Sequence, residues 1–191
     1  MKKSLGPNTF VYPTPVWVIG AYDENGRANM MTAAWAGVCC SKPPCVAVSL
    51  REATYTHGCI MARKAFTVNI GGENFAEQID YFGISTGRNV DKLSVTGLTA
   101  KSSTLVDAPF LEDFPLILEC RLKQVVEIGL HTQFVGEIID VKADTDIIGD
   151  KDAPDIEKLR PLIFSPVLRT YHGVGAAVGE AFSMGKKFRQ K

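Results

Sequence analysis

The clearest strand pattern in the chain lies in the run Leu116-Ile117-Leu118-Glu119-Cys120-Arg121-Leu122-Lys123. Leu116, Leu118, Cys120 and Leu122 alternate with Ile117, Glu119, Arg121 and Lys123. This two-residue period is typical of a β-strand with one face on a core and the other face mostly in water. A second run at 134–141 follows Glu127-Ile128-Gly129 and predicts an antiparallel hairpin partner.

The amino-terminal half predicts more short strands and two short helices. Pro7, Pro13 and Pro15 exclude a regular helix before residue 16 and indicate an extended arm. Asp23-Glu24-Asn25-Gly26 predicts a hairpin turn, and Lys42-Pro43-Pro44 predicts a break. The expected strands are 16–22, 28–38, 45–50 and 65–70, and the expected helices are 54–63, capped by Thr54, and 73–82.

These elements predict a mainly β fold, a closed or split β-barrel with a few short helices, rather than alternating βαβ units. Residues 85–110, rich in Ser, Thr, Gly and Asp, are expected to form a long ordered excursion over the barrel. Gly71-Gly72 and Gly173-x-Gly175 do not complete a dinucleotide-binding GxGxxG motif. At 191 residues, a single domain over 1–191 is expected.

Composition excludes several classes of partner. Lys plus Arg (21) balance Asp plus Glu (21), so no global field attracts nucleic acid or anionic lipid, and any anion site must be local. No apolar stretch approaches the ~20 residues that a bilayer needs, and the amino terminus lacks a signal core, so a cytoplasmic location is expected. The five cysteines include no CxxC pair. Cys39, Cys40 and Cys45 are close enough in sequence for a metal site, but we expect buried reduced thiols and no metal.

One candidate site lies at 49–57. Arg51 ends a strand, and Thr54 and Thr56 stand at the first turn of the following helix, where free N–H groups and the helix dipole favour an anion. Lys92 can add a positive charge from the excursion, so these residues predict a phosphate cradle. The alternative is structural: Thr54 caps the helix, and Arg51 pairs with Glu52 or Asp91 in solvent.

A second candidate is the uncharged strand Asn29-Met30-Met31-Thr32-Ala33-Ala34-Trp35. Its small residues let a flat ligand approach the backbone, and Trp35 with the Met pair offers polarizable surfaces, although such residues also serve as core. His131 begins the predicted strand before Gly136. It has no neighbouring Ser or Cys with which to form a nucleophilic pair, and His57 and His172 are too scattered to suggest a metal site.

The order and spacing of these stretches resemble the flavin reductase-like, FMN-binding split-barrel family, and within it the flavoredoxins. The resemblance spans nearly the whole chain. It is carried by residues 26–35, 42–51, 54–56, 66–70 and 91–92, the run 131–136, and the terminal stretches 171–175 and 182–187.

The resemblance implies a Greek-key split barrel that forms a homodimer with FMN near the subunit interface. The strand from Asn29 to Trp35 would face the isoalloxazine. Ser49, Leu50, Arg51, Thr54, Tyr55, Thr56 and Lys92 would hold the ribityl chain and phosphate. His131 is the implied catalytic candidate, and Tyr171-His172 would line the reactive face from either subunit.

The implied function is that of a redox flavoprotein that takes electrons from NAD(P)H or a protein donor and passes them to a flavin, ferric iron or a redox partner. Two alternatives stay open at this point. One is an FMN-containing electron carrier that does not use NAD(P)H, and the other is a binding module without flavin.

Overall fold

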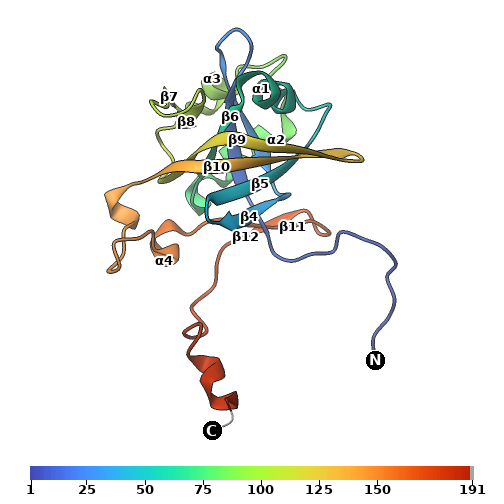
Figure 1. The fold of residues 1–191 in the computed structure, drawn as a ribbon, viewed down its shortest axis with the longest axis vertical. Helices are drawn as coiled ribbons and strands as arrows, with labels where there is room; N and C mark the ends of the chain where they lie inside the picture. The colour runs from blue at the N-terminus through green and yellow to red at the C-terminus, as the bar shows by residue number, and fades with distance from the viewer. Residues whose placement is uncertain (190–191) are drawn as a thin grey trace.

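The computed structural model describes residues 1–189, and antiparallel strands dominate it (Figure 1). The strands are β1 (Thr14–Pro15), β2 (Trp17–Tyr22), β3 (Ala28–Ala33), β4 (Ala36–Ser41), β5 (Pro44–Arg51), β6 (Ala65–Ile70), β7 (Ala100–Ser102), β8 (Pro109–Leu111), β9 (Leu116–Ile128), β10 (His131–Ala143), β11 (Ile163–Ser165) and β12 (Thr170–His172). The α-helices are α1 (Tyr55–Arg63), α2 (Ala76–Ile84), α3 (Lys92–Thr96) and α4 (Ile156–Leu159). Short 3-10 turns are η1 (Glu73–Phe75), η2 (Thr145–Ile147) and η3 (Met184–Phe188).

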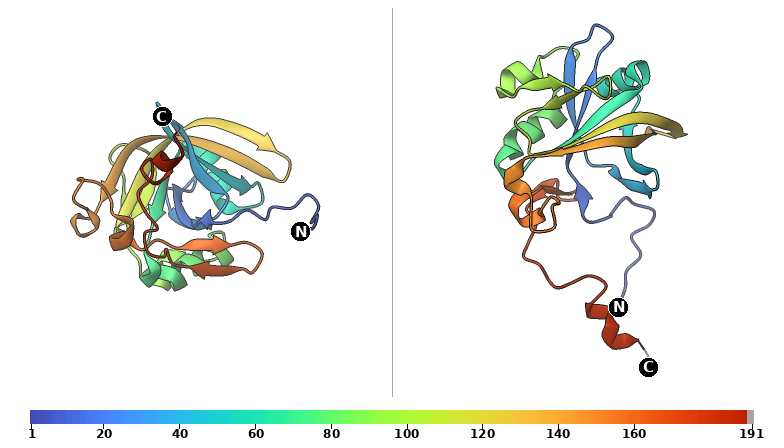
Figure 2. Two further views of the ribbon diagram at one scale, coloured as in Figure 1. Left: turned by 90° about the horizontal axis from the view of Figure 1, so that it is seen from below. Right: turned by 60° about the vertical axis from the view of Figure 1, so that its left-hand side comes forward.

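A seven-stranded sheet in the order β3-β2-β6-β9-β10-β5-β4 forms the body. Its two outermost strands, β3 and β4, are consecutive in the chain and are joined only by Ala34 and Trp35. The sheet therefore curls around a core, as Figure 2 shows, and the predicted split barrel is confirmed. The predicted single strand at 28–38 is wrong, because the chain turns at Ala34 and Trp35 and passes from one edge of the sheet to the other.

The long hairpin β9–β10 confirms the strand pattern at 116–123 and its hairpin partner, but the face expected in water is partly buried. Glu119 and Ile117, expected in water, are buried (0% and 3% exposed). Glu119 is paired with Lys142, and Ile117 packs in a second core cluster with Phe82 and Leu111. Both faces of the first half of β9 are therefore covered by protein.

The cover comes from the excursion expected at 85–110 and from the helix expected at 73–82. The stretch 85–110 holds helix α3, strand β7 and most of β8, which pairs with β7 as a two-stranded sheet. The helix expected at 73–82 begins as the 3-10 turn η1 and continues as α2 to Ile84. Among the described residues the core has three clusters: one inside the curled sheet around Phe66 and Phe134, one beneath α2 and β8, and a small one of Leu116, Ile147 and Leu159.

Both ends of the chain leave the body on the same side, as extended arms (Figures 1 and 2). A small sheet in the order β1-β11-β12 lies where the amino-terminal arm joins the body. Among the described residues, no helix is long and apolar enough to cross a membrane.

Candidate functional site

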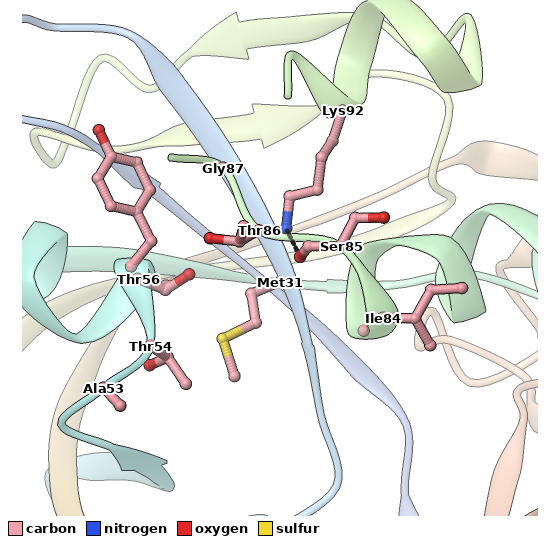
Figure 3. Close-up of a pocket in the computed structure, with 11 residues that line it drawn as sticks. Met31, Ala53, Thr54, Thr56, Ile84, Ser85, Thr86, Gly87 and Lys92 are labelled. Carbon is pink, nitrogen blue, oxygen red and sulfur yellow. Dashed lines mark hydrogen bonds between the residues drawn. The ribbon is translucent and has the colours of Figure 1, made fainter. Parts of the chain in front are cut away.

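The helix α1 begins at the mouth of a cavity of about 300 Å³, which we call the Lys92 pocket (Figure 3). The pocket is lined by one residue of β3, the start of α1, the end of α2 and the loop that follows it. The lining residues are Met31, Ala53, Thr54, Tyr55, Thr56, Gly83, Ile84, Ser85, Thr86, Gly87 and Lys92. Five of the predicted site residues therefore meet at one cavity: Met31, Thr54, Tyr55, Thr56 and Lys92.

Within the described part of the chain, no side chain caps the first turn of α1. Thr54 occupies the N-cap position, as expected, but its hydroxyl donates to the Arg51 carbonyl at 2.8 Å and accepts no bond from the helix N–H groups. No acidic residue stands in the first turn. The free N–H groups and the positive end of the helix dipole therefore remain available to an anion beside the pocket.

Lys92 brings a cation to the opposite wall. Its side chain is 5% exposed, and Nζ donates to the carbonyls of Phe82 and Ser85 at 3.2 Å each. Burial lowers the pKa of Lys92 to about 8. Two carbonyls do not neutralise an ammonium, so this buried charge still favours an anionic ligand.

Asn29 links β3 to the first turn of α1, two elements that line the pocket. Its Nδ2 donates to Thr56 Oγ1 at 2.8 Å, and both residues are buried. The Asn29 Oδ1 is buried with no hydrogen-bond partner among the described residues. A Cβ added at Gly87 would lie 2.0 Å from this oxygen, so the loop can pass Asn29 only with glycine at position 87.

Tyr55 is fixed by a charged group of the β2–β3 turn. Its hydroxyl donates to Asp23 Oδ2 at 2.8 Å, and this bond raises the pKa of Tyr55. Burial alone would raise the pKa of Asp23, but bonds from the Arg27 N–H, the Tyr55 hydroxyl and the Asn25 N–H outweigh it and leave that pKa below its usual value. The guanidinium groups of Arg88 and Arg27 lie 5.5 and 5.9 Å from the Tyr55 ring centroid.

The loop 85–88 forms a wall of the pocket, but the sequence analysis does not predict it as part of the site. The run Ser85-Thr86-Gly87-Arg88 combines two hydroxyls, a glycine and a cation, which is the signal that could have drawn attention to it. Arg27 Nη2 donates to the Gly87 carbonyl at 2.5 Å and ties this loop to the β2–β3 turn.

Arg51 lies outside the Lys92 pocket. It lines a neighbouring cavity of about 580 Å³, the hairpin hollow, which lies beside the β9–β10 turn and shares Ala53 with the pocket. The hollow is lined by Arg51, Glu52, Ala53, His57, Met61, Val125, Glu127, Gly129, Leu130 and Thr132. Within residues 1–189 Arg51 forms no ion pair, and Asp91, its suggested partner, caps α3 instead by accepting from the Leu93 and Ser94 N–H groups.

The remaining predicted residues lie in the core or make hydrogen bonds that hold the fold. The side chains of Met30, Ala33 and Leu50 lie in the core (0%, 5% and 1% exposed), so only their backbone is free to contact a ligand. Thr32 Oγ1 donates to the Ile79 carbonyl and thus ties β3 to α2. The Ser49 N–H donates to the Trp35 carbonyl at 2.8 Å, at the corner formed by Ala34 and Trp35.

His131 lies at the other end of the candidate site. Across β10 and β5 it pairs with Arg51, and its ring is nearly parallel to that of Trp35, at 9°, with centroids 6.5 Å apart. His57, given little weight in the sequence, bonds Thr132 Oγ1 through Nε2 at 3.0 Å. Tyr171 lies elsewhere and donates to Asp80 Oδ1 of α2 at 2.9 Å, and burial raises its pKa to about 12.

Comparison with known proteins adds a family to this geometry. A flavoredoxin of Desulfovibrio vulgaris (Miyazaki F) is 49% identical, with a TM-score of 0.93 over 97% of this chain and 100% of that one. A flavoredoxin from Methanosarcina acetivorans is 30% identical, with a TM-score of 0.93 over 99% and 100%. A high molecular weight rubredoxin of Moorella thermoacetica is 35% identical over 102 residues, which are 52% of this chain but only 43% of that relative. The model of the flavin reductase like domain matches residues 9–172, and the chain therefore belongs to the flavin reductase-like family and resembles its flavoredoxins.

Proposed function

We propose that this protein is an FMN-binding redox flavoprotein. The observation that carries the proposal is the meeting, across one cavity, of the uncapped first turn of α1 with the buried ammonium of Lys92. Hydroxyls, free N–H groups and one cation are the donors that a phosphate monoester needs. The match to the flavin reductase-like family supports a flavin as the rest of the ligand.

The cavity suits one end of such a ligand. At about 300 Å³ it is at the lower limit for small-molecule pockets, so it would accept the phosphate and part of the ribityl chain and leave the rings at its mouth. Met31 lines the pocket, and the corner formed by Ala34 and Trp35 ends the same strand. The strand from Asn29 to Trp35 would therefore carry the rings, with Met30 and Ala33 contributing backbone only.

Bound FMN would supply the electron-carrying chemistry, and the chain would bind, orient and shield it. In this proposal Thr54, Thr56 and Lys92 hold the phosphate. His131, stacked on Trp35, is the side chain proposed to act at the reactive face. The protein is proposed to work as a homodimer, with electrons drawn from NAD(P)H or a protein donor.

The absorption spectrum of the purified protein under nitrogen tests the proposal. Titration with FMN should produce a bound-flavin spectrum, and NADH or NADPH should then bleach it. Protein that stays colourless after soaking with FMN would contradict the proposal. A His131→Ala variant should bind FMN normally but be reduced more slowly, and an unchanged rate would remove His131 from the reaction.

The second candidate function is an electron carrier that ignores nicotinamides. The partial match to a high molecular weight rubredoxin supports it. That relative is named as a rubredoxin, a type of electron-transfer protein, and part of its chain is similar to this one. A carrier would keep its yellow colour with NADH and NADPH but lose it on mixing with reduced rubredoxin or ferredoxin. The same anaerobic titration therefore separates the two functions.

A further inference from the structure

Three of the five cysteines gather in the hairpin of β4 and β5, away from the Lys92 pocket. Cys39 and Cys40 are exposed and Cys45 is buried, so the expectation of buried thiols holds for Cys45, Cys59 and Cys120 but is wrong for Cys39 and Cys40. Cys40 and Cys45 are Cα partners across the two strands. Between Val38 and Cys40 the register shifts, which leaves Cys39 as the extra residue of a bulge.

Backbone geometry selects one bridge among these thiols. Directly opposed residues of antiparallel strands have Cα atoms about 4.5–5.5 Å apart, within the 4.4–6.8 Å that a disulfide spans. Neighbouring residues such as Cys39 and Cys40 are only about 3.8 Å apart, which is too short. Cys120 lies on β9, and β10 separates it from β5, so it is about two strand spacings from Cys45 and too far to be bridged.

We propose that the β4–β5 hairpin is a thiol–disulfide site in which Cys40 and Cys45 form a reversible cross-strand disulfide with a low-molecular-weight disulfide as oxidant. The proposal is independent of the bound flavin. It assigns the thiols different tasks according to their exposure.

Cys40, the exposed thiol, reacts first. Its thiolate attacks one sulfur of oxidised glutathione, the glutathione S–S bond breaks, and one glutathione leaves as a thiol after taking a proton from water. Burial, and then the neighbouring Cys40 and Cys39, raise the pKa of the Cys45 thiol, which suits it to the second step rather than the first. Cys45 loses its proton to water and attacks the Cys40 sulfur, and the second glutathione leaves. The second glutathione also takes a proton, so the two protein thiols have lost two protons and two electrons, and oxidised glutathione has gained both.

The test uses the full chain, reduced and then exposed to oxidised glutathione. After unfolding without reductant, alkylation should label three thiols instead of five, because two of the five are bridged. The mass should fall by two hydrogens within residues 28–51, which trypsin leaves as one peptide since Pro43 follows Lys42. Burial raises the pKa of Cys59 to about 11 and that of Cys120 to about 12, so both should stay reduced.

Matched variants locate the bridge. Cys39→Ser should still form it, Cys40→Ser should not, and Cys45→Ser should stop at a glutathione adduct on Cys40. Cys40 is exposed, so Cys40→Ser should fold even if Cys45→Ser does not. Five alkylated thiols after oxidation of the parent, loss of the bridge in Cys39→Ser, or its survival in Cys40→Ser would each overturn the proposal.

Discussion

Asn29 Nδ2 donates to Thr56 Oγ1 at 2.8 Å, and this buried bond joins β3 to the first turn of α1. The two elements belong to the two sequence stretches predicted separately to hold a flat ring and a phosphate. This bond therefore links the candidate ring strand directly to the candidate phosphate turn.

Replacing Asn29 by Ala should lower the free energy of unfolding by about 1–3 kcal/mol, because the buried Thr56 hydroxyl loses its partner. Urea unfolding of the flavin-free protein measures this loss. Asn89→Ala, at an exposed position, is the matched control and should change little. In Asn29→Ala/Thr56→Val the combined loss should be smaller than the sum of the two single losses, and strict additivity would show that the bond contributes nothing.

Lys92→Met should weaken FMN binding by about 1–3 kcal/mol and leave riboflavin binding nearly unchanged, because only FMN carries the phosphate. Fluorescence titration with both ligands measures the difference. Arg51→Ala is the informative comparison, since Arg51 lines the hairpin hollow instead of the Lys92 pocket. If Arg51→Ala removes the preference for FMN and Lys92→Met does not, the phosphate lies in the hollow.

The affinity for FMN should depend on pH through Lys92. Because burial lowers the pKa of Lys92 to about 8 in the free protein, its amine is charged below that pH and neutral above it. A bound anion would raise this pKa, so binding takes up a proton and affinity should fall as pH rises above 8. Titrations between pH 7 and 9.5 avoid the phosphate's own ionisation near about 6. The slope should be absent in Lys92→Met and for riboflavin, and an equal slope for riboflavin would assign it to another group.

Gly136→Ala should destabilise the fold by about 1–3 kcal/mol through overpacking. A Cβ at this position would lie 2.4 Å from Phe66 Cζ and 3.0 Å from Cys120 Cβ, inside the curled sheet. Gly37→Ala in β4 is the control, because no atom of residues 1–189 lies within 4 Å of its added Cβ. The Gly136→Ala variant should melt at a clearly lower temperature than Gly37→Ala. Equal melting temperatures would show that Phe66 moves aside without cost to stability.

The strands that were predicted correctly are those whose pattern is local. The alternation along β9 and the Asn25-Gly26 turn before β3 depend on neighbours in sequence, and both are found. Glu119 was misplaced because its buried carboxylate is paired with Lys142 of β10, a residue 23 positions farther along the chain. The break at Ala34 and Trp35 has no glycine or proline to announce it, since the curl of the whole sheet imposes it.

The candidate site, like the fold, was predictable where it depends on residues close in sequence. Thr54 and Thr56 come together because a helix begins there, and that start was visible in the sequence. The wall formed by Ser85, Thr86 and Gly87 was not, because it approaches α1 only after α2 has packed on β3. Arg51 was grouped with Lys92 by the charge that they share, whereas the direction of each side chain separates them.

The two-residue connection between β3 and β4 holds the two edges of the curled sheet close together. Only Ala34 and Trp35 connect these two outermost strands. Each residue added there would therefore let the two edges of the sheet move farther apart. Trp35 of this connection also stacks beside His131 of β10, with ring centroids 6.5 Å apart. We therefore expect a longer connection to change two things together, the closure of the sheet and the position of the Trp35 ring beside His131.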